Sequence, residues 1–180
     1  DTGVSSQFAS ALLMVGVLLP GGLTVTLEGA RAESPYINMT IAMMKQFGIE
    51  VRREGRSCHI PHKEIFGCKE YRIEPDVSGA CYFYAMAPLL KTDVIVNNVH
   101  ENSLQGDIRF LDVLERMGCR REDTNEGIRI SGSRLLGYPG IDVSMRDFSD
   151  QTMTLAALAP FAEGPVLIRD VGHIRLQESD

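Results

Sequence analysis

The chain has 180 residues, of which 44% are hydrophobic and 23% are charged, the proportions of an ordinary globular protein that can bury a core. Its formal net charge of −6 argues against a nucleic-acid-binding protein, which presents a basic face to phosphates. A small anionic ligand remains possible, because a few basic residues in a cleft can hold one. The length indicates one or two domains.

An apolar run over residues 8–19 opens the chain. It is shorter than the roughly 20 residues that span a bilayer, and the start Asp1-Thr2-Gly3 lacks the basic residues of a signal peptide. We therefore expect no membrane attachment. The run predicts a helix that is buried on nearly all sides and that ends at Pro20.

Three segments share one pattern, in which a polar start is followed by an apolar helix, a short turn and a β-rich strand. They are residues 5–29, 78–99 and 149–171, and Ser6, Ser78 and Asp150 follow one another at equal steps. The repeated unit of about 70 residues predicts a helix, a strand, a second helix and two or three strands. The chain begins inside one unit and ends inside another, so we expect a piece of a longer protein.

The second helix of the unit is amphipathic and occurs twice, over residues 35–47 and 106–117. The expected inward stripes are Ile37, Ile41 and Met44, and then Phe110, Leu114 and Met117. Gly48 and Gly118 lie where a helix C-cap favours a left-handed residue. The strands expected after them are 49–54, 57–61, 118–122 and 128–132.

The chain contains four cysteines and no Cys-x-x-Cys pair: Cys58, Cys68, Cys81 and Cys119. This is typical of reduced thiols in a cytosolic protein. Cys58, His59 and His62 precede Cys68 closely, but their spacing matches no common zinc pattern. We expect a strand and a loop there, and no metal site.

Polar residues precede the first apolar helix at Ser5, Ser6 and Gln7. A helix N-terminus offers unpaired N–H groups and partial positive charge, so these side chains could line an anion site. Simple N-capping by serine is the alternative. Asp150 is similarly either a helix cap or a general base facing a cleft. Polar residues also crowd the segment 173–180, where a solvated loop is the alternative to a site.

Five motifs, "SSQF", "PYINMT", "SLQGDIRFLDVLERMG", "SDQTMTLAALAPFA" and "RLQESD", occur in this order, and the chain resembles the EPSP synthase family of enolpyruvyl transferases. The resemblance implies an α/β (α+β) fold of repeated βαβαββ units, an inverted α/β barrel arrangement, here truncated. It implies that residues 1–104 hold the last repeat unit of a first lobe. Residues 105–180 would then form the first one and a half units of a second lobe.

The implied reaction transfers the enolpyruvyl group of phosphoenolpyruvate to the 5-hydroxyl of shikimate 3-phosphate and releases phosphate. It uses no metal and no organic cofactor, and its partners are small molecules rather than nucleic acid or membrane. The resemblance further implies a cytoplasmic enzyme that is a monomer. We expect residues 1–180 alone to be inactive.

The resemblance assigns substrate-binding roles to Ser5, Ser6, Gln7, Tyr36, Asp150, His173 and Gln177. Asp150 is also implied to take or orient the hydroxyl proton, and Glu178 to transfer a proton at the enol carbon. Two positions depart from the family pattern, since Glu33 replaces a serine and Gln177 replaces a lysine. These departures leave open a related transferase with another acceptor, and a non-catalytic repeat domain is a third reading.

Overall fold

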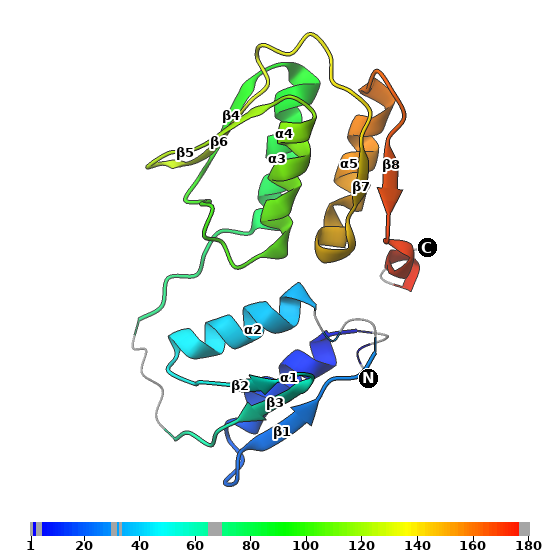
Figure 1. The fold of residues 1–180 in the computed structure, drawn as a ribbon. Helices are drawn as coiled ribbons and strands as arrows, with labels where there is room; N and C mark the ends of the chain where they lie inside the picture. The colour runs from blue at the N-terminus through cyan, green and yellow to red at the C-terminus, as the bar shows by residue number, and fades with distance from the viewer. Residues whose placement is uncertain (1, 3–4, 30–31, 33, 65–69, 177–180) are drawn as a thin grey trace. The chain divides into compact units, whose positions relative to one another are not determined.

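The computed structural model describes residues 2, 5–29, 32, 34–64 and 70–176. The chain divides into two compact units, Asp1–Arg72 and Ile73–Asp180, which are drawn in Figure 1. Each unit has its own hydrophobic core. The lobe boundary expected between residues 104 and 105 stays a prediction.

The first unit packs two helices on a three-stranded antiparallel sheet. Its elements are α1 (Gln7–Gly16), β1 (Leu23–Thr26), α2 (Pro35–Gln46), β2 (Arg52–Glu54) and β3 (Ser57–Ile60). The strand order is β1-β3-β2. Because side chains alternate along a strand, Cys58 and Ile60 enter the core while Ser57 and His59 face outward.

Helix α1 differs from the prediction that it is buried on nearly all sides. Only the stripe formed by Ala9, Leu13 and Gly16 is buried, because α2, β1 and β3 contact the helix from one side. Phe8 is 67% exposed and Met14 is 55% exposed. The helix also ends at Gly16, ahead of the stop expected at Pro20.

The second unit begins with the same sequence of elements as the first. These are α3 (Val77–Leu90), β4 (Asp93–Asn97), the short 3-10 helix η1 (Gly106–Arg109), α4 (Phe110–Arg116), β5 (Arg120–Asp123) and β6 (Gly127–Ser131). The antiparallel strand order is β4-β6-β5. Because it matches β1-β3-β2 strand for strand, the predicted repeat is confirmed.

A third repeat starts within the second unit. It comprises β7 (Asp142–Ser144), η2 (Arg146–Gln151), α5 (Thr152–Leu158), η3 (Ala159–Phe161), β8 (Leu167–Arg169) and η4 (Gly172–Leu176). Strands β7 and β8 pair in parallel, with Val143 opposite Ile168. Parallel neighbours need a crossover connection, which α5 supplies.

The amphipathic stripes are confirmed. Phe110, Leu114 and Met117 are fully buried, and Ile37 and Met44 are buried with Ile41 packed against them. The two glycines that follow the stripes have positive φ, 76° at Gly48 and 100° at Gly118, as a left-handed C-cap requires.

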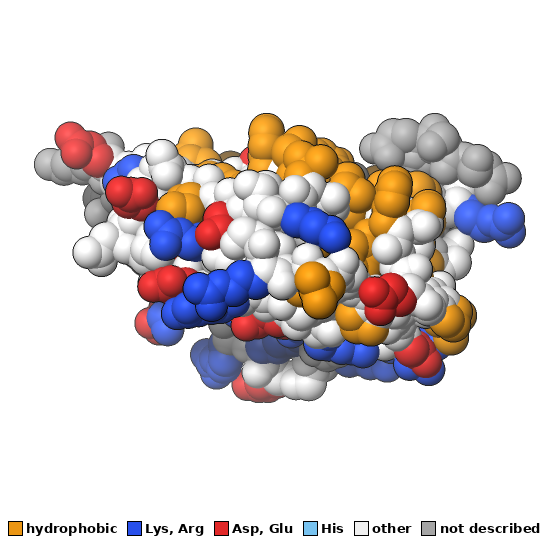
Figure 2. All heavy atoms as spheres, turned by 90° about the horizontal axis from the view of Figure 1, so that it is seen from above, with side chains coloured by type: hydrophobic (Ala, Val, Ile, Leu, Met, Phe, Trp, Pro, Cys, Tyr) orange, Lys and Arg blue, Asp and Glu red, His pale blue; other side chains and the backbone are white. Residues whose placement is uncertain are grey.

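Hydrophobic side chains also gather on the surface, as the face in Figure 2 shows. On α3 the exposed ones include Tyr82 at 57%, Phe83 at 56% and Leu90 at 64%. Among the described residues, none of the helices combines the length and apolarity that crossing a membrane requires.

Candidate functional site

The start of α1 holds three of the predicted site residues. The Gln7 backbone N–H donates to Ser5 Oγ over 3.1 Å, so the Ser5 oxygen is an acceptor while its own hydroxyl proton stays available to donate. Ser6 is only 5% exposed, and Gln7 is exposed. No acidic side chain lies in the first turn of α1, so the positive end of the helix dipole is not neutralised there.

The start of α2 holds Tyr36, which directly follows Pro35 and is 41% exposed. Thr40 Oγ1 lies 2.9 Å from Ser10 Oγ and links the two helices near these starts. The N-terminal ends of α1 and α2 lie on the same side of the first unit (Figure 1). Two helix N-termini with polar side chains are suited to an anion.

In the second unit Asp150 lies between two buried neighbours. Ser149 is 7% exposed and Gln151 is fully buried, whereas Asp150 itself is exposed. His173 Nε2 lies 2.9 Å from Ser149 Oγ, so the structure brings His173 to the segment that carries Asp150. An exposed carboxylate on a fixed backbone can accept a proton from a bound ligand.

Asp107 is a buried carboxyl that the sequence analysis missed. It is 5% exposed, and it accepts a short hydrogen bond from the Ser78 hydroxyl. Burial raises the pKa of Asp107, and the nearby charges of Asp150 and Asp76 raise it further. The sequence did contain a signal of this burial. Asp107 lies three residues before Phe110, so it falls on the same helix face as the apolar stripe.

The remaining predicted positions lie outside the described residues. These are Gln177, Glu178 and the variant position Glu33. The described site residues therefore form two groups: Ser5, Ser6, Gln7 and Tyr36 in the first unit, and Asp150 and His173 in the second.

Two of the candidate metal ligands, Cys58 and His59, lie on opposite faces of β3, and His62 follows the strand. Cys58 is fully buried, while His59 faces outward and its Nδ1 lies 3.0 Å from Thr24 Oγ1. The three described cysteines are buried, and burial raises the pKa of Cys119 to about 11. Cys68 lies outside the described residues. No group of three or more potential metal ligands occurs in the part of the chain that the structure describes.

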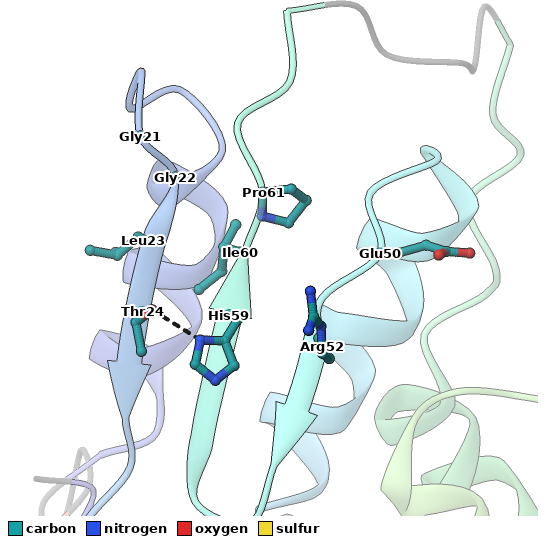
Figure 3. Close-up of a pocket in the computed structure, with 9 residues that line it drawn as sticks. All are labelled: Gly21, Gly22, Leu23, Thr24, Glu50, Arg52, His59, Ile60 and Pro61. Atoms are coloured by element: carbon teal, nitrogen blue, oxygen red, sulfur yellow. Dashed lines mark hydrogen bonds between the residues drawn. The ribbon is translucent and has the colours of Figure 1, made fainter.

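A shallow pocket of about 280 Å³ lies on the outward face of this sheet. Figure 3 shows His59 and Arg52 on neighbouring strands at this pocket, with Gly21 and Gly22 on the turn before β1. A second pocket, of about 390 Å³, lies beside β5 and β6 and includes Arg120. Neither pocket is lined by a predicted site residue.

The whole chain, residues 1–180, matches the family model of EPSP synthase (3-phosphoshikimate 1-carboxyvinyltransferase). Relatives of that name include those of Idiomarina loihiensis and Trichormus variabilis. The first is 41% identical over 182 residues, covering 100% of this chain and 42% of the relative. The second is 40% identical over 177 residues, covering 98% of this chain and 41% of the relative.

Two solved structures have the same fold. An EPSP synthase from Acinetobacter baumannii has a TM-score of 0.73 at 24% identity, covering 99% of this chain and 41% of that one. An enolpyruvyl transferase from Streptomyces tendae has a TM-score of 0.66 at 18% identity, covering 94% and 40%. The chain thus spans about two fifths of the length of the proteins it matches. With its full length matched by the family model, the chain belongs to the EPSP synthase family.

Proposed function

We propose that a longer protein containing residues 1–180 transfers the enolpyruvyl group of phosphoenolpyruvate to the 5-hydroxyl of shikimate 3-phosphate. The hydroxyl oxygen bonds to C2 of the enol while C3 gains a proton. The C2–O bond to phosphate then breaks, C3 loses a proton, and phosphate leaves. The family match over the whole chain supports this reaction, and the exposed Asp150 between two buried neighbours is the structural observation that carries it.

In the first unit, Ser5 and Ser6 bind the 3-phosphate together with the start of α1. Because Ser5 Oγ accepts the Gln7 N–H, its hydroxyl proton can point to the anion. Gln7 reaches both substrates, and Tyr36 lies along the ring of shikimate 3-phosphate. The absence of acidic side chains from the first turn of α1 favours this role, because a carboxylate there would repel the phosphate.

In the second unit, Asp150 accepts or orients the proton of the 5-hydroxyl, and His173 contacts the same substrate. The contact between His173 and Ser149 keeps the imidazole next to the Asp150 segment. Glu178 serves proton transfer at C3, and Gln177 contacts shikimate 3-phosphate. The enzyme works in the cytoplasm as a monomer and needs no cofactor.

A transferase with a different acceptor is the second candidate. Gln177 replaces a cationic side chain of the family motif, and charge-assisted hydrogen bonds are roughly twice as strong as neutral ones. Weaker binding of the phosphorylated acceptor would follow, unless Arg175 supplies the missing charge. This candidate shares the attack on C2 of phosphoenolpyruvate and differs only in the hydroxyl that attacks.

The test is phosphate release by a protein that joins residues 1–180 to the remaining length of its relatives. Release that requires both phosphoenolpyruvate and shikimate 3-phosphate supports the first candidate. Release with phosphoenolpyruvate and another acceptor alone supports the second. A folded protein that releases phosphate with neither would contradict both. Residues 1–180 alone, assayed in parallel, are expected to give no turnover.

A further inference from the structure

Burial of the Asp107 carboxyl lowers the stability of the folded chain. It is 5% exposed, and within the described part of the chain its Oδ1 has no hydrogen-bond partner. An unpaired buried oxygen costs free energy, and the cost is larger for a charged group. Only Oδ2 is paired, with the hydroxyl of Ser78. Stability alone does not account for a carboxyl at this position.

The surroundings of Asp107 connect it to Asp150 through Gln151. The Gln151 amide lies near enough to favour the charged form of the Asp107 carboxyl, although it makes no regular hydrogen bond with Oδ1. Gln151 Nε2 also lies 3.4 Å from the backbone oxygen of Ser78. Its Oε1 accepts a hydrogen bond of 2.9 Å from the Thr154 hydroxyl. The fully buried Gln151 is thus held by side chains and backbone of two helices.

The residue on the other side of Asp150 is held independently. The Ser149 hydroxyl lies 2.9 Å from His173 Nε2, and the Ser149 carbonyl accepts the Thr152 backbone N–H. The backbone of η2 is irregular just before this point, because Phe148 has non-helical dihedrals of φ −144° and ψ 46°. The side-chain contact of Ser149 therefore adds to the few backbone hydrogen bonds of this irregular segment.

We propose that Asp107 and Ser78 are positioning residues for Asp150, acting through Gln151. The Ser78–Asp107 pair fixes the polar surroundings of the Gln151 amide, and Gln151 fixes the backbone from which the Asp150 carboxylate projects. This inference rests on the proposed function of Asp150. Asp107 itself touches no substrate, since it is buried.

The first test is Asp107→Asn in the full-length enzyme. Asparagine keeps the shape and one acceptor, but its NH₂ group turns the carboxyl into a donor that competes with the Gln151 amide. We expect kcat to fall roughly 10- to 100-fold with KM for both substrates within about threefold, as misplacement of a reacting group predicts. The thermal midpoint is expected not to fall. Asp112→Asn, an exposed carboxyl on α4, is the control and should keep kcat.

Ser78→Ala and Ser78→Thr test the same contact without altering the carboxyl. If Asp107→Asn does not fold, these two variants test the positioning role on their own. Ser78→Ala removes the donor to Asp107 and should lower kcat, while Ser78→Thr keeps a hydroxyl and should restore most of it. Unchanged kcat in both folded Asp107→Asn and Ser78→Ala overturns the proposal. So does a loss of stability that accounts for the whole loss of activity.

A readout without substrate separates this proposal from the proposed function. Amide hydrogen exchange at Thr152, whose N–H donates to Ser149, should be faster in Asp107→Asn than in the wild type and in Asp112→Asn. Faster exchange supports the positioning role even if the wild type proves to lack synthase activity. Unchanged exchange at Thr152 contradicts it even in an active enzyme.

Discussion

Nε2 of His173 lies 2.9 Å from Oγ of Ser149, and this contact joins η4 to the residue that precedes Asp150. Two segments that are 24 positions apart in sequence thereby present an imidazole and a carboxylate from the same region of the second unit. The contact gives His173 a fixed orientation, which a histidine in a solvated loop would not have.

Replacing His173 by phenylalanine keeps an aromatic ring and removes both ring nitrogens. We expect the dissociation constant for shikimate 3-phosphate to rise roughly 2- to 10-fold, the equivalent of one lost hydrogen bond. Isothermal titration calorimetry on the full-length protein measures it. His173→Asn retains a donor and should bind nearly as well as the wild type. Equal affinity of the wild type and both variants would show that His173 does not contribute to binding of shikimate 3-phosphate.

Replacing Asp150 by asparagine removes a base and leaves an exposed side chain of the same size. We expect kcat to fall by about 10²–10⁴, the usual contribution of a general base, with an unchanged unfolding midpoint. Steady-state phosphate release measures the effect. Asp147→Asn is the matched control, because Asp147 pairs with Arg109 over 2.6 Å at the surface and such pairs contribute little. Similar rates for both variants would argue that Asp150 does not transfer a proton.

The hydroxyl of Tyr84 anchors α3 to the sheet of the second unit. It donates to the Ile128 backbone oxygen over 3.1 Å, and the side chain is fully buried. Tyr84→Phe should lower the free energy of unfolding by about 0.5–1.5 kcal/mol, with more expected if the carbonyl stays unpaired. Tyr82→Phe on the same helix should change it by less than about 0.5 kcal/mol, because Tyr82 is 57% exposed. Urea unfolding of both variants gives the comparison.

The raised pKa of Asp107 has a consequence for the pH dependence of stability. Burial raises the pKa of this carboxyl above its ordinary value of 3.8, so the folded state holds the proton more tightly than the unfolded state. The stabilisation from the bound proton is complete below that ordinary value and is lost as pH rises through the folded pKa. An asparagine at this position has no titratable proton, so the Asp107→Asn variant shows no such loss of stability. The variant should therefore gain stability relative to the wild type as pH rises above the ordinary carboxyl value of 3.8, as urea midpoints would show. A difference independent of pH would contradict this.

Periodicity predicted the buried face of α4 well, because polar residues flank a single apolar stripe on this helix. Phe110 and Leu114 lie on that stripe. The same reasoning failed for α1, because its apolar residues surround the helix and only Gln7 and Ser10 are polar. Periodicity cannot identify the buried face of such a helix, and the structure shows that only the stripe through Leu13 is covered by the first unit.

The sequence predicted residues of the candidate site but not the contacts that hold their neighbours in place. Ser5 and Asp150 were proposed because polar groups precede apolar helices, a local pattern. The contacts of Asp107 with Ser78 and of His173 with Ser149 join segments more than 20 residues apart. Such contacts depend on how α3 packs against η1 and how η2 meets η4, which the local pattern does not contain.

The separation of the two cores affects how any melting experiment is read. One core draws its buried residues from Ala9 to Ile60, and the other draws them from Val77 to Leu158. Two cores without a shared residue can lose their order at different temperatures, so heat denaturation of this chain need not be a single all-or-none event. A calorimetric trace with two peaks would then assign each substitution to its own transition, with Tyr84→Phe moving one peak and leaving the other in place.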